Sequence, residues 1–266
     1  MQIAQTDCCQ LRRVGMSVQI NHTSPMIPFK PITDDEPALI HSPLLKAALL
    51  TIGYIETNGP IDLTPSKALK RYFVQWAADA FAWPNYTAED LYAVNKVLNE
   101  ADFPPLLVLH DVLLAAKLAR HYKGAMQVTS LAKKLKARPA ELWRVLASTL
   151  LCVIDHSQYT RNGDTLVGNW DIFLNVINVE AQNSVTEERL CSLLFGVREE
   201  DIWRAHYRLA AAFYIHVLRP LCWVGVMDEY RIGKGLSRRE PFAKTPLWPV
   251  ALGLETDRDV RPSTRH

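Results

Sequence analysis

The chain has 266 residues, of which 48% are hydrophobic, and its 30 Lys and Arg nearly balance 28 Asp and Glu. This composition excludes disorder over the whole length and allows one large domain or two small ones. No run of about 18 apolar residues predicts a membrane-spanning helix, and the first twenty residues lack the apolar core of a signal peptide. The five cysteines are odd in number and form no C-x-x-C motif, so we expect reduced thiols and a cytoplasmic protein.

Charge is distributed along the chain in blocks. Residues 1–110 carry 8 basic and 11 acidic side chains, residues 111–147 carry 8 and 2, residues 148–203 carry 3 and 9, and residues 204–266 carry 11 and 6. Such alternation suits docking within the chain or a charged partner, and only the basic blocks suit nucleic acid. The alternative interpretation is that these charges lie on solvated faces of helices.

Residues 1–41 predict an extended or disordered N-terminal arm. They contain four prolines between positions 25 and 37, an acidic cluster at 34–36 and little periodicity. The sequence does not decide whether translation starts at Met1, Met16 or Met26.

Residues 42–154 predict a helical, winged-helix-like subdomain. Ser42 is followed by proline, which predicts a capped helix start. Thr87, with Asp90 three residues later, resembles a capping box. The apolar run at 106–122 ends in basic residues and predicts a helix, because those charges complement the helix dipole.

A helix-turn-helix-like segment ends this subdomain. A short extended stretch at 124–129 leads into a helix at 130–137, the breaker Arg138-Pro139 and a longer helix at 140–154. This order is typical of a winged helix, so we expect a mainly α fold with tandem winged-helix-like subdomains and short β-hairpins. The turn lacks the usual glycine, and the longer helix is apolar on nearly every side, which is typical of a buried helix.

Basic side chains gather in this segment and would face the phosphates of a duplex. They are Lys133, Lys134, Lys136, Arg138 and Arg144. The sequence therefore favours a nucleic-acid-binding accessory or regulatory protein with a degenerate winged helix, using the basic block at 111–147. The alternative is a protein-interaction module in which the helix-turn-helix is structural and does not bind DNA.

The second half of the chain predicts a polar loop at 155–169 and a second helical subdomain at 170–256. Segments at 221–232 and 245–255 are rich in β-branched and aromatic residues and predict the strands of a C-terminal β-hairpin. Residues 257–266 predict a frayed tail.

Two stretches look like distant copies at an offset of 65 residues. In both, a glycine (Gly59 and Gly124) is followed by a short apolar segment that reaches a threonine opening the next helix (Thr64 and Thr129). This pattern fits two tandem helical subdomains.

No signature of catalysis or metal binding is present, since the chain lacks P-loop, G-x-G-x-x-G, G-x-S-x-G and H-E-x-x-H motifs. Cys152 and His156 would lie one helical turn apart, but a zinc site normally shows paired ligands in two places. The loop at 155–169 collects acid, base and hydroxyl groups with nothing to fix their geometry. We therefore expect no catalytic residue, metal, cofactor or membrane partner, and an enzyme is the least supported interpretation.

Three runs of sequence resemble an uncharacterised bacterial family. They are GPIDLTPSKALKRYFVQWAADAF, LYAVNKVLNEADFPPLLVLHDVLLAAKLARHYKG and LRPLCWVGVMDE. The family comprises hypothetical proteins related to the C-terminal part of plasmid Ri-type open-reading-frame-three-like proteins. The resemblance spans roughly residues 44–255, although Ser66-Lys67 stands where that family has a glycine. It implies a helical, winged-helix-like fold, often of mobile-element origin, with no catalytic residues to carry over.

Overall fold

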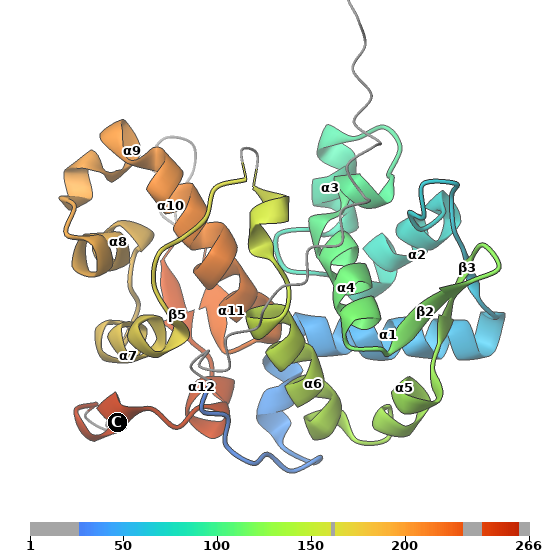
Figure 1. Cartoon of the computed structure of the whole chain (residues 1–266), viewed down its shortest axis with the longest axis horizontal. Coiled ribbons are helices and arrows are strands. Elements are labelled where there is room, and N and C mark those ends of the chain that lie inside the picture. Colours follow the sequence, from blue (N-terminus) through green and yellow to red (C-terminus); the bar gives the residue numbers. More distant parts are fainter. Residues whose placement is uncertain (1–26, 161–162, 231–240, 261–266) are drawn as a thin grey trace, which may run out of the picture.

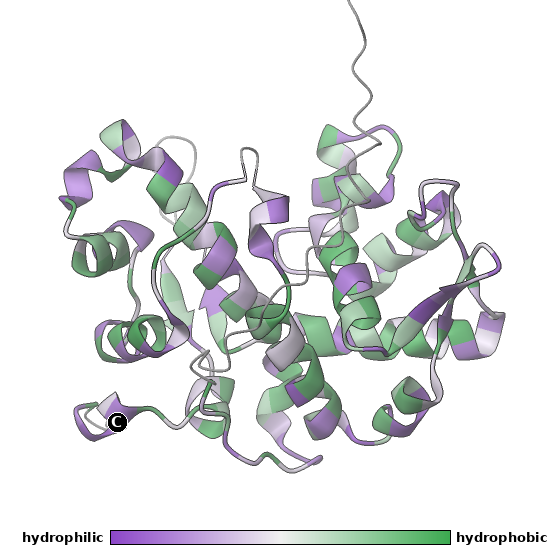
Figure 2. Cartoon of the chain, in the orientation of Figure 1, coloured by the Kyte–Doolittle hydropathy of each residue, from purple (hydrophilic) through white to green (hydrophobic). Residues whose placement is uncertain are grey.

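The protein is described by a computed structural model that places residues 27–160, 163–230 and 241–260. Helices hold 59% of the described residues and strands 10%, so the prediction of a mainly helical fold is confirmed. Among these residues, none of the helices is both long and apolar enough to cross a membrane. Figure 2 shows hydrophobic residues on the faces that the helices turn toward one another, and hydrophilic residues along the outer surfaces.

Two units repeat one order of elements: a helix, a strand position, two shorter helices, a further helix or helical run and a β-hairpin (Figure 1). The first unit contains α1 (Pro43–Asn58), β1 (Ile61–Asp62), α2 (Arg71–Phe81), α3 (Ala88–Val94), α4 (Pro104–Ala115), β2 (Ala119–Tyr122) and β3 (Ala125–Val128). The second contains α7 (Trp170–Glu180), the bridging residue Val185, α8 (Glu187–Phe195), α9 (Ile202–Ala205), α10 (Tyr207–Phe213), the π-helical turn η5 (Tyr214–Leu218), α11 (Arg219–Val224), β4 (Met227–Glu229) and β5 (Phe242–Lys244).

Helices α5 (Ser130–Leu135) and α6 (Pro139–Cys152) connect the two units. The remaining elements are α12 (Leu247–Ala251) and the short 3-10 helices η1 (Pro37–His41), η2 (Glu100–Asp102), η3 (His156–Tyr159), η4 (Glu199–Asp201) and η7 (Glu255–Arg258).

In both units the first strand position pairs with the last strand. The first sheet has the order β1-β3-β2, all antiparallel, with Ile61 opposite Met126. In the second unit Val185 bridges Phe242 of β5, and β5 pairs with β4. The two stretches that look alike at an offset of 65 pair with each other in the first sheet, where the Leu63 N–H donates to the Gly124 carbonyl over 2.8 Å.

Three helix starts that the sequence predicted are confirmed, because side-chain oxygens satisfy the free N–H groups of the first turn. The Ser42 hydroxyl accepts from the N–H of residue 45, with proline following it. Thr87 and Asp90 form a capping box at α3. The Thr129 hydroxyl accepts from the N–H of residue 132 and so caps α5.

Two predicted elements are wrong. The helix expected at 106–122 ends at Ala115, because Lys117 has a left-handed backbone (φ 57°) and the following residues form β2 against β3. In the predicted strands at 221–232 and 245–255, α11 and α12 take up much of the sequence, and among the described residues β4 is the only strand within them. The β-branched and aromatic residues there are buried, and burial favours such residues in a core helix as well as in a strand.

Helix α6 lies at the centre and packs against α1 and α4 of the first unit and against α11 of the second (Figure 1). Leu142, Leu146 and Leu150 are fully buried. The Trp143 indole N–H donates to the Val224 carbonyl over 2.8 Å, at the end of α11. This helix therefore joins the cores of the two units.

The described part of the predicted arm, residues 27–41, packs on the rest of the molecule. The Phe29 ring meets the Trp143 ring edge to face, 5.4 Å between centroids. The Asp34 carboxylate accepts from the Ala140 N–H over 3.0 Å and so caps the beginning of α6. Part of this segment thus covers the end of α6 that the sequence assigned to DNA, while residues 1–26 lie outside the described residues.

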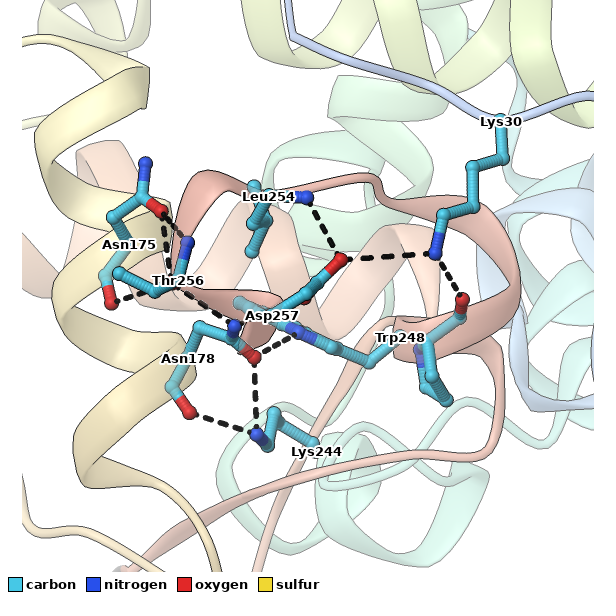
Figure 3. Close-up of polar contacts among 9 residues, drawn as sticks. Lys30, Asn175, Asn178, Lys244, Trp248, Leu254, Thr256 and Asp257 are labelled. Carbon is cyan, nitrogen blue, oxygen red and sulfur yellow. Dashed lines mark hydrogen bonds and ion pairs between the residues drawn. The ribbon is translucent and has the colours of Figure 1, made fainter. Parts of the chain in front are cut away.

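A closed polar cluster fixes the C-terminal segment to α7 (Figure 3). Asn178 is 2% exposed, and its side-chain oxygen accepts from the Trp248 indole and the Lys244 ammonium. Its amide nitrogen donates to Thr256 and Asp257. Because every polar atom of this buried amide has a partner, we assign the cluster a structural role.

Candidate nucleic-acid interface

The β2–β3 hairpin and α5 form one connected basic structure at the edge of the first unit (Figure 1). Thr129 joins them: its N–H donates to the Leu118 carbonyl and its hydroxyl donates to the Lys117 carbonyl, both over 2.9 Å. The same hydroxyl caps α5. The turn that opens the hairpin is therefore held against the beginning of the helix.

The basic side chains of this structure are exposed, and no acidic side chain among the described residues pairs with them. We call them the hairpin–α5 surface, made of Lys117, Arg120, Lys123, Lys133 and Lys134. Tyr122 stands among them and is 48% exposed. The Arg120 guanidinium and the Lys123 ammonium lie 5.4 Å and 5.3 Å from the centre of its ring. Cations around an exposed aromatic ring are typical of surfaces that contact nucleic acid.

The turn at the hairpin tip is formed by Lys123 and Gly124, both with positive φ (49° and 76°). A two-residue turn of this kind favours Asn-Gly or Asp-Gly, because a lysine side chain has no local hydrogen bond to offset the left-handed backbone. The backbone conformation of the turn therefore does not explain the lysine at position 123. A lysine here places a positive charge at the tip of the hairpin.

The structure separates the five basic residues that the sequence assigned to the site. Lys133 and Lys134 belong to the hairpin–α5 surface. Lys136 forms an ion pair of 2.6 Å with Glu56, and Arg138 pairs with Glu141.

Arg144 lies elsewhere, on a groove of about 530 Å³ between α6 and residues 30–34. It is exposed and has no ion pair among the described residues. Lys30 and Asp34 share this groove, so both signs of charge line it.

Helix α6 does not present a surface that could enter a groove of DNA. Eight of its fourteen residues are buried, and Arg144 and Cys152 alone are exposed. Its polar residues Glu141, Ser148 and Thr149 are at most partly exposed. Because other helices surround α6, it packs in the core and cannot reach the edges of DNA bases.

Beneath the hairpin, a chain of three polar side chains connects β2 with α4 and η2. The His121 and His110 Nε2 atoms lie 2.8 Å apart, and His110 Nδ1 lies 2.6 Å from the Glu100 carboxylate, which also accepts from the Leu69 N–H. Burial and the neighbouring His110 lower the pKa of His121. These hydrogen bonds anchor the hairpin to the core, while the Lys and Arg side chains supply the positive charge of the hairpin at neutral pH.

Sequence reasoning missed Lys117, Arg120 and Lys123 as site residues because it placed them at the end of a helix. Gly124, which lies between two short stretches of the sequence, is the turn signal that could have identified a hairpin. The cysteines at 152, 191 and 222 are free thiols, and within the described ranges no three His, Cys, Asp or Glu side chains are grouped to hold a metal ion.

The comparisons with known proteins define the class of protein. The N-terminal domain of the Y4jL family matches residues 40–141, and the C-terminal domain of the same family matches residues 160–246. "Uncharacterized protein y4jL" of Sinorhizobium fredii (strain NBRC 101917 / NGR234) is 38% identical over 174 residues, which are 64% of this chain and 78% of that protein. The chain therefore belongs to the bacterial y4jL family. No solved structure matches it.

Proposed function

We propose that this protein binds the phosphate backbone of nucleic acid through the hairpin–α5 surface. The observation that carries the proposal is that five exposed cations on one connected structure have no acidic partner among the described residues. Phosphates attract such cations and release counterions from the nucleic acid, which favours binding at low salt. The surface offers few groups for base recognition, so the binding is directed at the backbone and depends weakly on sequence.

The order of elements supports this proposal. Helix, strand, helix, helix and hairpin, with sheet order first-third-second, is the order of a winged helix, and both units resemble it but have one further helix before the hairpin. In that reading α4 and the α10–α11 run take the place of the recognition helix. Both are largely buried, so the wing remains as the contacting part. The link to plasmid Ri-type proteins stays a prediction from sequence resemblance.

A protein-interaction module is the second candidate, favoured by one specific observation. Tyr92, Val94 and Val97, on and just after α3, are 43%, 80% and 44% exposed. Neighbouring exposed apolar side chains are typical of contacts between proteins. A module of this kind binds through α3 and does not need the cations of the hairpin.

Fluorescence anisotropy of a labelled 20-base-pair duplex of mixed sequence, titrated at several salt concentrations, tests the proposal. Replacing Lys133 and Lys134 together with Glu should weaken binding about tenfold or more and make the salt slope shallower by about two. Both side chains are exposed, so thermal melts should shift little. Lys123→Asn should weaken binding while leaving the hairpin intact, because Asn-Gly suits this turn.

The matched control reverses two exposed lysines of the first unit outside the surface, Lys46→Glu with Lys96→Glu. It changes the net charge equally and should weaken binding much less. If the parent protein binds no duplex at low salt, or if the two double variants lose affinity equally, the hairpin–α5 surface is not a nucleic-acid interface. A protein-interaction module then becomes the better reading.

A further inference from the structure

A cavity of about 240 Å³ lies where the two units meet. The first unit contributes Trp83 and Tyr86, which follow α2, and the second contributes Arg219 and Trp223 from α11 and Asp228 from β4. The Trp83 and Trp223 rings meet edge to face, 5.6 Å between centroids. Residues distant in the sequence thus form a small pocket with aromatic walls and charged groups of both signs.

Arg219 is the unusual member of this pocket. Its side chain is 8% exposed, and its Nε and Nη2 atoms are buried with no hydrogen-bond partner among the described residues. Its guanidinium lies 4.7 Å from the centre of the Trp223 ring and 5.9 Å from that of Tyr159. No carboxylate within the described ranges forms an ion pair with it.

Burial lowers the pKa of Arg219, yet an arginine keeps its charge in proteins. Stacking on aromatic rings offsets part of the desolvation of a guanidinium, but it leaves the N–H donors unsatisfied. A buried charge without a partner is strongly unfavourable. An anionic group in the pocket would satisfy both the charge and the two donors.

The acidic side of the pocket restricts the kind of anion. Asp228 is partly buried, and burial raises the pKa of its carboxyl group. Glu229 also lines the pocket, where its carboxylate accepts from the Tyr214 hydroxyl over 3.1 Å. Two carboxyl groups repel a dianion such as phosphate and favour a ligand that brings a hydrogen-bond donor to this side.

We propose that the pocket binds a small aromatic carboxylate that carries an amino or hydroxyl donor. Its carboxylate would pair with Arg219, its ring would pack against the Trp83 and Trp223 walls, and its donor would face Asp228. The volume is below the range of about 300–1,000 Å³ of typical ligand pockets, which limits the ligand to a single ring. This proposal does not depend on the binding of nucleic acid.

Isothermal titration calorimetry on the full-length protein tests the proposal with three related compounds. We expect 4-aminobenzoate to bind most tightly, benzoate about tenfold more weakly because it lacks the donor, and aniline not measurably because it lacks the carboxylate. Binding should also change the fluorescence of Trp83 and Trp223. If 4-aminobenzoate does not bind at millimolar concentration, or if aniline binds as well as 4-aminobenzoate, the proposal is wrong.

Variants assign the contacts. Arg219→Met should abolish binding of 4-aminobenzoate without lowering the melting temperature of the free protein, because it removes an unpaired buried charge. Asp228→Asn should reduce the preference for 4-aminobenzoate over benzoate. Arg204→Met, at an exposed arginine of α9, is the matched control and should bind like the parent. Binding retained by Arg219→Met contradicts the proposal, and if that variant does not fold, the three compounds on the parent protein still decide.

Discussion

The two units share an order of elements but differ in whether their exposed basic side chains form ion pairs. In the first unit and the adjoining α5, the hairpin–α5 surface exposes five cations with no acidic partner among the described residues. In the described part of the second unit most exposed arginines are paired. The pairs are Arg189 with Glu180 and Glu199, Arg198 with Glu200 and Asp201, and Arg208 with Asp164.

This difference shows that charge counts alone do not locate a binding surface. Even within the basic block at 111–147, acidic partners pair with some of the cations: Glu56 with Lys136 and Glu141 with Arg138. Exposed ion pairs contribute little stability, but each neutralises a cation that would otherwise attract phosphate. A polyanion should therefore contact the first unit.

The largest effect is expected where the two units join. Trp143 is 1% exposed and touches both Phe29 and Val224, so Trp143→Ala should lower the free energy of unfolding by about 3–5 kcal/mol. Chemical denaturation measures this loss. Because α6 belongs to both cores, the parent should unfold in one transition and the variant should expose both units together.

The matched control is Trp203→Ala in the second unit. That side chain is 55% exposed and its indole donates to Glu188, so the loss should stay within about 1 kcal/mol. If Trp143→Ala is no less stable than this control, the two units do not depend on α6.

The next effect concerns stability in acid, which should depend on His156 in η3, between the two units. Burial lowers the pKa of His156 from 6.5 to about 4, and its Nε2–H donates to the Leu150 carbonyl. The unfolded chain therefore binds this proton more readily than the folded one. The free energy of unfolding should fall by about 3 kcal/mol as the pH drops from 6.5 to 4, with no contribution above that window.

Melts at pH 7 and pH 4.5 check this prediction. His156→Gln should lose less stability on acidification than the parent, since its amide can donate to the same carbonyl without titrating. His206→Gln, at an exposed position of the second unit, should lose as much stability on acidification as the parent. An equal acid loss in His156→Gln and the parent would remove His156 as the cause.

The smallest effect sharpens the comparison of paired and unpaired cations. Glu180→Gln with Glu199→Gln releases Arg189 from both of its partners. Stability should change by about 1 kcal/mol or less, because all three side chains are at least partly exposed. The salt slope of duplex binding should become steeper by at most about one. A weaker interaction with duplex after this release would contradict the role that we assign to ion pairing.

Helix starts and much of the helical content follow from local sequence. Ser42, Thr87 and Thr129 each cap a helix as predicted, because a side-chain oxygen reaches a free N–H a few residues ahead whatever the rest of the fold does. The burial of α6 also follows from its apolar composition. These signals depend on neighbours in the chain.

The failures share a physical cause, which is dependence on distant partners. Residues 119–122 read as the end of a helix, but hydrogen bonds to β3 make them a strand. The stretch at 221–232 reads as a strand, but burial between the units makes its first part a helix. Local propensity is a weak preference, and long-range pairing or packing overrides it.

The sequence by itself determined a mainly helical chain, its main helix starts, the block of positive charge and the apolar character of α6. Tertiary structure alone decided which of those charges remain without partners, since Glu56 is 80 residues from the Lys136 that it neutralises. It also decided that Trp83 and Arg219, from different units, line one pocket. Ion pairing and burial are properties of neighbours in space, which the order of residues along the chain does not specify.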